Sequence, residues 1–309
     1  MKKVIVSTTI QSPTESIERF DNLRDWTLVV AGDLRTPKDY RLKNGIYLSP
    51  QAQEKRHKKL SDLIGWNSHA RRNFALLAAK ELKADIVALV DDDNLPLDHW
   101  GKDLVVGQKI TANFYRTSED AFDPLRVTNY PHLWHRGFPV QLVSSRNYDG
   151  PEKREVPVDI QADLWNGDPD VDAVCRMVYK PECQFDRGCF PIASDKPSPF
   201  NSQNIFITKR VLPHYFILPH LSPLGRESDI WIAYHLWSRG FRVVYCEPSV
   251  YQKRNPHDLT QDMEDEFLGY KRNIDIVRAI ADKSYDPRKF WPEATCRAYE
   301  AYQAVFGQP

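Results

Sequence analysis

The first hundred residues alternate between short apolar runs and a segment with helical spacing. Residues 4–6, 28–31 and 86–90 are brief, rich in β-branched side chains and followed by polar residues, as expected of strands buried on both faces. Apolar residues between 70 and 82 recur at spacings of three and four, which predicts a helix with one buried face. A strand, a helix and a second strand in this order predict a parallel sheet.

Regular patterns return only in the last third of the chain. Residues 110–200 are rich in proline and aromatic side chains and show little periodicity, so we interpret them as a loop-rich insertion over the sheet. The later pattern predicts strands at 204–207 and 242–246, and helices at 229–239, 261–283 and 290–305. We therefore expect residues 1–309 to form one α/β domain, with a mostly parallel, Rossmann-like sheet flanked by helices.

Composition and charge narrow the class of protein. Hydrophobic residues make up 41% of the 309 residues and charged residues 27%, which is enough for a folded core. The 42 basic residues balance the 42 acidic ones, which removes the net-charge argument for nucleic-acid binding. The five cysteines lack a CxxC spacing, and no apolar stretch approaches a membrane span. We therefore expect reduced thiols in a cytoplasmic protein without a transmembrane segment.

Polar side chains follow each of the three apolar runs near the N-terminus. Thr8 and Thr9 come after the first, Asp33 after the second, and the sequence Asp-Asp-Asp-Asn at 91–94 after the third. In α/β sheets, ligands bind beyond the carboxyl ends of the strands. This edge of the sheet is therefore the candidate site.

The acidic run at 91–93 is the strongest local signal. Adjacent carboxylates repel one another, and a divalent cation such as Mg²⁺ or Mn²⁺ would compensate them with oxygen ligands. Spaced one residue apart, Asp91 could serve a bound nucleotide and Asp93 the metal, with Asp92 beside them. The alternative is a solvated turn that uses Asp and Asn as ordinary turn formers.

Two arginines precede the third run. Arg71 is a candidate for phosphate binding, since its guanidinium fork matches phosphate oxygens, whereas we interpret Arg72 as a surface residue. Asp33 could accept a hydrogen bond from a nucleotide base, or it could be a turn aspartate; the sequence favours neither.

Glu227 and Asp229 precede or begin the helix at 229–239. Transfer of a group with inversion needs a carboxylate that takes a proton from the acceptor hydroxyl, and Asp229 is our candidate for this base, with Glu227 second. The competing interpretation, which the helix geometry alone favours, is that Asp229 caps the helix.

Further candidates lie in loops. His257 could supply a metal ligand through a ring nitrogen. Asn201 and Gln203 carry amides that donate to and accept from sugar hydroxyls, and Trp165 could either stack on a sugar or fill the core. The acids between 168 and 172 are expected to begin a helix and to be solvated.

Six segments, taken in order, resemble the STELLO-type glycosyltransferases. They are 66–73 (WNSHARRN), 90–94 (VDDDN), 165–173 (WNGDPDVDA), 198–204 (SPFNSQN), 228–231 (SDIW) and 252–257 (QKRNPH). The resemblance implies a GT-A fold, a nucleotide-diphosphate-sugar donor and a divalent metal at a DxD-like Asp91 and Asp93. It also makes a base at Asp229 and a metal ligand at His257 more credible. Plant members of this group carry a membrane anchor and further sequence that this chain lacks.

The resulting hypothesis is a metal-dependent hexosyl- or pentosyltransferase. A UDP-sugar would be the donor, a sugar, glycan or other hydroxyl compound the acceptor, and the reaction would be inverting. Residues 1–109 would form the nucleotide-binding half, 110–260 the acceptor-binding half with its loop-rich insertion, and 261–309 a C-terminal helical region. Asp93 and His257 would hold Mn²⁺ or Mg²⁺, Asp229 or Glu227 would act as base, and the donor would contact Thr8, Thr9, Asp33, Arg71, Asp91, Asp92, Asn201 and Gln203.

Three other functions compete with this one. A nucleotide-sugar mutase or self-glycosylating protein would need no external acceptor. A catalytically silent nucleotide-sugar-binding component would bind the donor without turnover. A nucleotidyltransferase is weaker, since the chain has no GxxxxGK[ST] phosphate loop.

Overall fold

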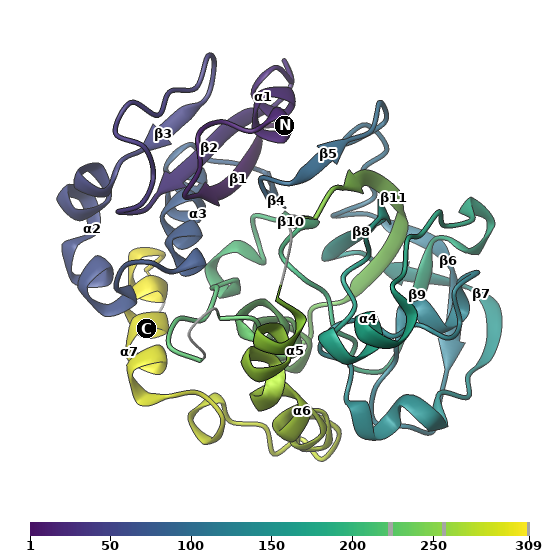
Figure 1. The fold of residues 1–309 in the computed structure, drawn as a ribbon. Helices are drawn as coiled ribbons and strands as arrows, with labels where there is room; N and C mark the ends of the chain where they lie inside the picture. Colours follow the sequence, from purple (N-terminus) through teal and green to yellow (C-terminus); the bar gives the residue numbers. More distant parts are fainter. Residues whose placement is uncertain (222–224, 255–257, 308–309) are drawn as a thin grey trace.

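The computed structural model describes residues 1–221, 225–254 and 258–307 of the chain (Figure 1). Its centre is a single sheet of eleven strands. The N-terminal part of this sheet is parallel, in the order β3-β2-β1-β4. Its strands are β1 (Lys3–Thr9), β2 (Thr27–Gly32), β3 (Ile46–Leu48) and β4 (Ile86–Val90). β4 is buried over its whole length, as its continuous apolar sequence predicts.

The remaining strands extend the sheet beyond β4. They continue in the order β10-β8-β11-β9-β6-β7, while β5 pairs with β11. Their bounds are β5 (Asn94–Pro96), β6 (Lys109–Arg116), β7 (Asp149–Pro157), β8 (Ile160–Gly167), β9 (Ile192–Ser194), β10 (Asn204–Thr208) and β11 (Val243–Gln252).

The expected α/β class is confirmed, but the sheet is mixed rather than mostly parallel. β10 runs antiparallel to both of its neighbours, and β6 runs antiparallel to β7. Parallel neighbours need a long crossover, usually a helix, whereas antiparallel neighbours do not. The insertion supplies only one α-helix, of 7 residues. Its strands join the sheet both in antiparallel pairs and in parallel ones, β8 with β11 and β6 with β9.

The insertion is also more regular than its weak periodicity predicts. Residues 110–200 contain β7, β8, β9, most of β6 and the helix α4 (Ala173–Tyr179). β7 escaped detection because all but one of its side chains are exposed, which leaves no apolar alternation to read. Asp172 caps α4 by accepting a hydrogen bond from the Cys175 backbone N–H at 2.8 Å, as the expectation of a helix start there requires.

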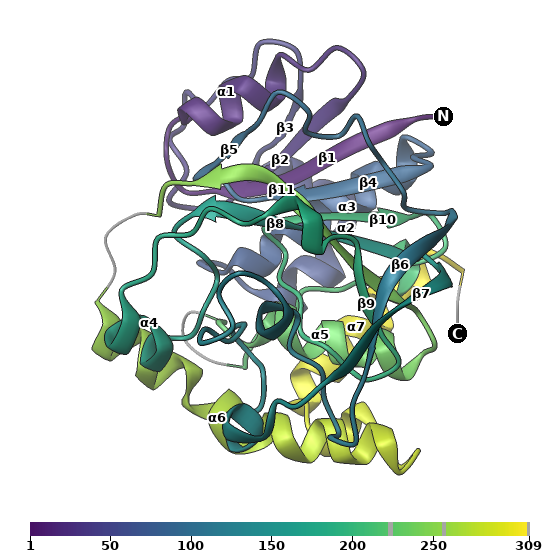
Figure 2. The ribbon, with the colours of Figure 1, turned by 90° about the vertical axis from the view of Figure 1, so that its right-hand side faces the viewer.

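Most helices lie on one side of the sheet. Figure 2 shows the sheet crossing the middle of the view, with α1 above it and α4, α5, α6 and α7 below. The other helices are α1 (Glu15–Asp21), α2 (Pro50–Ile64), α3 (Arg72–Glu81), α5 (Ser228–Ser238), α6 (Leu259–Ala281) and α7 (Glu293–Val305). Short 3-10 turns occupy His69–Arg71, Pro124–Val127, Val140–Ser145, Arg187–Cys189, Leu212–His214 and Pro287–Lys289. Within the part of the chain that the structure describes, no helix combines the length and apolar character that a membrane crossing requires.

Candidate functional site

A pocket of about 350 Å³ lies at the carboxyl ends of β1, β2 and β4. The three polar clusters expected at this edge do meet here. The lining residues are Thr8, Thr9, Ile10, Gln11, Asp33, Arg35, Asn67, Ser68, His69, Arg72, Asp91 and Asp92. The structure therefore brings together most of the candidates for nucleotide binding that come from the first hundred residues.

The two threonines of β1 tie the pocket wall to the acidic run. The Thr8 hydroxyl donates to the Ala31 carbonyl at 2.6 Å, which holds the end of β1 against β2. The Thr9 hydroxyl donates to the carboxylate of Asp92. Burial nevertheless raises the pKa of Asp92, and the neighbouring Asp91 adds to the shift.

Arg72, not Arg71, is the arginine of this pocket. Its guanidinium forms an ion pair with Asp91 and donates to the Ser202 carbonyl and hydroxyl, both at 2.9 Å. The interpretation of Arg72 as a surface residue was wrong, since only 3% of the residue is exposed. The first turn of α3 points it inward, toward the ends of β4 and β10.

Arg71 is fully buried on the other side of the same turn. Its guanidinium carbon lies 3.6 Å from the ring centre of Trp66 and 4.1 Å from that of Phe74. Its nitrogens donate to the Gln53 side chain, at 2.6 and 2.9 Å, and to Ser61. Arg71 therefore packs α2 against α3, and it is absent from the lining of the pocket.

Asp33 lines the pocket but is occupied by the backbone. One carboxylate oxygen accepts the N–H groups of Leu34 and Asn67, at 2.6 and 2.9 Å. The other accepts the N–H of Ser68 at 3.0 Å. Of the two sequence interpretations, the turn aspartate matches these contacts. Asp33 fixes the loop that leads into α3, and a base could use only its remaining lone pairs.

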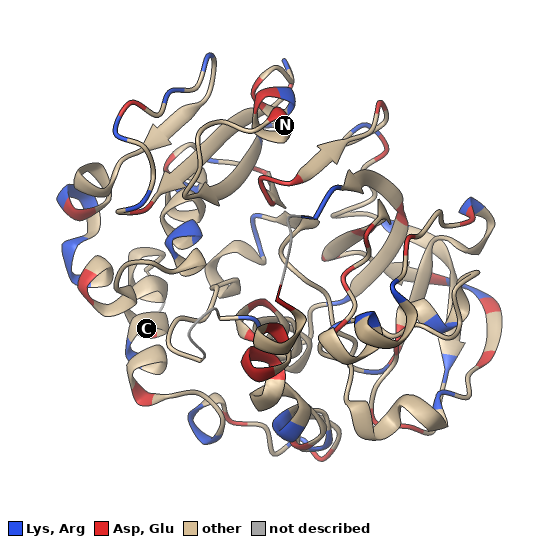
Figure 3. Cartoon of the chain, in the orientation of Figure 1, with Lys and Arg blue, Asp and Glu red and all other residues tan. Residues whose placement is uncertain are grey.

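Asp93 differs from Asp91 and Asp92 because one buried oxygen of its carboxylate lacks a hydrogen-bond partner among the described residues. Its Oδ1 is buried and has no hydrogen-bond partner among the described residues. Burial and the charge of Asp91 raise its pKa to about 7, although the Arg254 guanidinium opposes the shift. Figure 3 shows the basic segment after β11 facing the acidic run after β4, and the Lys253 N–H donates to the Asp93 carbonyl at 3.3 Å.

An unpaired buried carboxylate oxygen beside a second carboxylate is what a divalent cation would satisfy. Asp93 and Asp91 are thus suited to hold Mg²⁺ or Mn²⁺, whose remaining ligands would be donor phosphate and water. Among the described residues, no group of three or more His, Cys, Asp or Glu side chains is arranged to hold a metal ion. The expected third ligand, His257, lies outside the described residues.

A buried ion network adjoins the pocket through Ser202. Arg136 donates to the Asp229 carboxylate at 3.0 and 3.1 Å, and to the Asp170 carboxylate at 2.9 and 3.1 Å. Asp229 also accepts the Ser202 backbone N–H at 3.1 Å. Arg254 lies 3.6 Å from Asp170, which brings the network close to the acidic run. The expectation that Asp170 is a solvated capping residue was wrong, because the residue is fully buried.

The electrostatic state of Asp229 bears on its candidacy as a base. Burial opposes its ionisation, but the Arg136 guanidinium outweighs burial and lowers the pKa. The residue sits in the first turn of α5, while Glu227 occupies the cap position. Asp229 is therefore no helix cap. In this structure it is an ionised carboxylate whose hydrogen bonds go to Arg136 and Ser202.

Glu227 lies deeper in the protein and away from the pocket lining. Burial raises its pKa to about 8, and Arg136 opposes that shift only in part. Its Oε2 accepts a hydrogen bond from the Asn273 amide at 3.3 Å. A carboxyl group that stays protonated near neutral pH at this depth is suited to a structural role more than to proton abstraction from a substrate.

The other candidates from the sequence are also placed. The Asn201 amide donates to Asp170 at 2.8 Å, and the Gln203 backbone N–H donates to the Asn201 side chain at 3.0 Å. Both residues thus border the ion network and do not line the pocket. Trp165 fills the core, with 1% of it exposed. All five cysteines are free thiols.

Sequence reasoning missed His69 as a separate candidate. It lines the pocket, and its Nε2 forms a hydrogen bond with the Ser228 hydroxyl at the start of α5. It therefore links the pocket to the helix that carries Asp229. Its residue type was visible within 66–73, but its partner lies 159 residues away. Arg136 was missed for the same reason.

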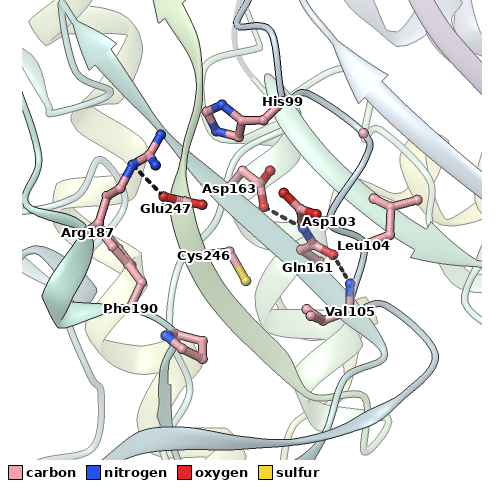
Figure 4. Close-up of a pocket in the computed structure, with 12 residues that line it drawn as sticks. His99, Asp103, Leu104, Val105, Gln161, Asp163, Arg187, Phe190, Cys246 and Glu247 are labelled. Atoms are coloured by element: carbon pink, nitrogen blue, oxygen red, sulfur yellow. Dashed lines mark hydrogen bonds and ion pairs between the residues drawn. The ribbon is translucent and has the colours of Figure 1, made fainter.

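A second cavity of about 400 Å³ lies away from this cluster, beside β8 and β11 (Figure 4). Asp103, Asp163 and Glu247 approach one another there, and Arg187 pairs with Glu247 at 2.9 Å. Burial, with Glu247 and Asp103 nearby, raises the pKa of Asp163 to about 7. The Gln161 amide donates to Asp163 at 2.8 Å, so protein contacts already satisfy this carboxyl.

The fold and site define an α/β protein with an acidic strand-end pocket. Comparison with known proteins gives two similar sequences. No family model matches the chain. The chain is similar to two Arabidopsis thaliana proteins, each described as a probable glycosyltransferase. STELLO2 is 26% identical over 274 residues, covering 81% of this chain and 35% of the relative. STELLO1 is 28% identical over 244 residues, covering 74% and 30%.

These matches confirm the resemblance to STELLO-type glycosyltransferases that the six motifs indicate. The chain spans about a third of the length of the relatives it matches.

Two solved structures show weaker likeness. Glucosyl-3-phosphoglycerate synthase of M. tuberculosis has a TM-score of 0.45 and 13% identity, with 89% of this chain and 81% of that chain covered. GalNAc-T7 with UDP, GalNAc and Mn²⁺ has a TM-score of 0.34 and 10% identity, with 99% and 54% covered.

Proposed function

We propose that this protein is a glycosyltransferase with a GT-A-type fold that binds a nucleotide-diphosphate sugar in the strand-end pocket. The observation that carries the proposal is the convergence of Thr9, Arg72, Asp91 and Asp92 on one pocket. Beside it lies Asp93, whose Oδ1 has no hydrogen-bond partner within the described part of the chain. The similarity to two probable glycosyltransferases over most of the chain supports the class of reaction. A volume of about 350 Å³ falls within the usual range of small-molecule sites.

Within this pocket we assign the donor's parts by charge and donor capacity. Arg72, whose Nε has no hydrogen-bond partner among the described residues, is the group that suits phosphate oxygens. Asp91 and Asp93 would hold the divalent metal, which when bound neutralises charge that develops on the leaving diphosphate. Residues 1–109 would thus form the nucleotide-binding half and 110–260 the acceptor-binding half. UDP as the nucleotide is the simplest hypothesis for the first assay.

Asp229 remains our candidate for the base, and an inverting reaction follows from that choice. In this structure its carboxylate accepts hydrogen bonds from Arg136 and Ser202. To take a proton from an acceptor hydroxyl, it would exchange one of these bonds for a bond to the acceptor. Arg136 would then keep Asp229 ionised and oriented. The Ser202 N–H would fix the second carboxylate oxygen.

The experiment that tests this function is a UDP- and GDP-release assay over a panel of nucleotide sugars, with Mn²⁺, with Mg²⁺ and with EDTA. We expect metal-dependent release from one donor, faster when the correct acceptor is added. Release of free nucleotide without an added acceptor, with the sugar found on the protein, would indicate a self-glycosylating protein. A rearranged nucleotide sugar without nucleotide release would indicate a mutase. Donor binding without any release would favour a catalytically silent nucleotide-sugar-binding component.

A further inference from the structure

A third cavity, of about 730 Å³, lies at the end of α5 opposite to Asp229. α5 has 11 residues, so its ends are roughly 15 Å apart at 1.5 Å per residue. The cavity is formed where the ends of α5 and α6 meet α7 and the start of β11. Its lining residues are His235, Trp237, Ser238, Arg239, Gly240, Arg242, Ile280, Lys283, Tyr285, Pro287, Tyr299 and Gln303.

The charge of this lining has one sign. Arg239, Arg242 and Lys283 are basic, and the lining includes no Asp or Glu. Among the described residues, none of the three forms an ion pair. Of the acids nearby, Asp159 pairs with Arg210 and Asp286 with Arg288, while Asp195 also acts on Arg242. A bound anion would balance the lining.

The ends of two helices explain the positions of two of the three basic residues but not that of the third. Arg239 follows α5 and Lys283 follows α6, where a cation complements the negative end of a helix dipole. Arg242 lies at the start of β11 instead, held with its guanidinium carbon 4.3 Å from the Trp237 ring centre. Packing on Trp237 fixes this arginine in place, and its Nη1 donates to the Phe241 carbonyl at 3.3 Å.

A second, independent feature is an unused buried donor or acceptor in the same wall. His235 is 5% exposed, and its Nδ1 has no hydrogen-bond partner among the described residues. Its Nε2 contacts the Tyr299 hydroxyl at 3.2 Å, and that hydroxyl accepts the Gln303 amide at 2.9 Å. This series of hydrogen bonds favours the Tyr299 hydroxyl as the donor to Nε2, which places the imidazole proton on the free Nδ1.

We propose that this cavity binds a small phosphorylated molecule, such as a phosphate ester or a diphosphate. The guanidinium groups of Arg239 and Arg242 and the ammonium group of Lys283 are suited to bind phosphate oxygens. The aromatic side chains Trp237, Tyr285 and Tyr299 offer apolar walls to the rest of the ligand. This site is separate from the donor pocket, and the inference does not depend on glycosyl transfer.

The test uses inorganic pyrophosphate as the probe and chemical acetylation of lysines as the readout, with EDTA present to prevent metal-assisted binding at the acidic run. Lys283 lines the cavity, and the exposed Lys289 nearby does not, so Lys289 is the internal control. We expect pyrophosphate to slow acetylation of Lys283 by about fivefold or more and that of Lys289 by less than about twofold, relative to sodium chloride of equal ionic strength.

Two variants separate specific binding from a general charge effect. Arg239→Gln should abolish the protection of Lys283, whereas Arg239→Lys should keep most of it, and both change an exposed residue. Equal protection of Lys283 and Lys289, no protection of either, or full protection in Arg239→Gln would each overturn the inference. Because Lys283 reports locally, a failure here is distinct from a failure of donor turnover.

Discussion

The acidic run after β4 and the buried pair Asp170 and Asp229 both consist of aspartates, but the pKa shifts of Asp93 and of the pair have opposite signs. Asp170 and Asp229 share Arg136, which lowers the pKa of both despite burial. Asp93 is half-buried, its Oδ1 has no hydrogen-bond partner among the described residues, and its pKa is raised to about 7. The protein compensates one group internally and leaves the other to be compensated from outside. That difference is the basis of our proposal that the acidic run binds a cation and a phosphorylated ligand.

The largest expected effect comes from removing the internal compensation. Arg136→Met would leave the buried Asp229 without its cation and Asp170 with Arg254 alone, which should lower the free energy of unfolding by about 3–5 kcal/mol. Arg19→Met breaks an exposed pair with Glu15 and should cost less than about 1 kcal/mol. Urea unfolding of both variants measures the difference. Equal stability would show that Arg136 does not support the network.

Neutralising Asp93 should have the opposite effect: stability should be kept and donor turnover lost. Because its Oδ1 has no hydrogen-bond partner among the described residues, Asp93→Asn should leave the free energy of unfolding unchanged or higher. Metal-dependent donor turnover should fall by about 100-fold or more, since the variant loses a charged metal ligand. Donor-release kinetics and urea unfolding of the same sample test both halves. A marked loss of stability with intact turnover would contradict the assignment.

The neighbouring arginines offer a sharper form of the same comparison. Arg71→Met removes hydrogen bonds to Gln53 and Ser61 and should cost about 1–3 kcal/mol of stability while donor affinity stays unchanged. Arg72→Met removes the partner of Asp91 at the pocket and should weaken donor binding about tenfold. Calorimetric titration with the donor measures the affinity of both variants, and thermal unfolding measures their stability. An equal loss of donor affinity in both would refute the distinction.

The last expected effect is a change in the pH dependence of stability. The pKa of Glu227 is raised to about 8 from an ordinary 4.5, so the folded protein holds this proton more tightly than the unfolded chain. Its contribution to stability is full below pH 4.5 and is lost as the pH rises toward 8, by at most about 1.4 kcal/mol per pH unit. Glu227→Gln should flatten this slope between pH 5 and 8. Parallel stability profiles for the two proteins would argue against a buried, protonated Glu227.

The sequence predicts the parallel half of the sheet well because its signals are local. The strands near residues 4, 28 and 86 are short apolar runs, and their polar ends meet as the carboxyl-end rule for parallel strands requires. β7 shows the limit of this approach. Its exposed side chains carry no alternation, so its place in the sheet depends on pairing with β6.

The residues of the candidate site also fall into those that the sequence predicts and those that it does not. The pocket candidates Thr8, Thr9, Asp91 and Asp92 follow directly from strand ends. The partners of Asp229 do not, because Arg136 lies 93 residues earlier in the chain and only tertiary packing brings the two together. Arg71 and Arg72 illustrate a finer limit. Adjacent residues at the start of a helix point in different directions, and the sequence does not say which faces the pocket.

The most direct test of the account is calorimetric titration of UDP into the wild-type protein and Asp93→Asn, each in Mn²⁺ and in EDTA. The account predicts that wild-type affinity falls about tenfold or more when Mn²⁺ is replaced by EDTA, and that Asp93→Asn binds weakly in both. The same affinity in all four titrations, or no UDP binding by the wild type with Mn²⁺, would contradict a metal-assisted UDP-sugar site at the end of β4.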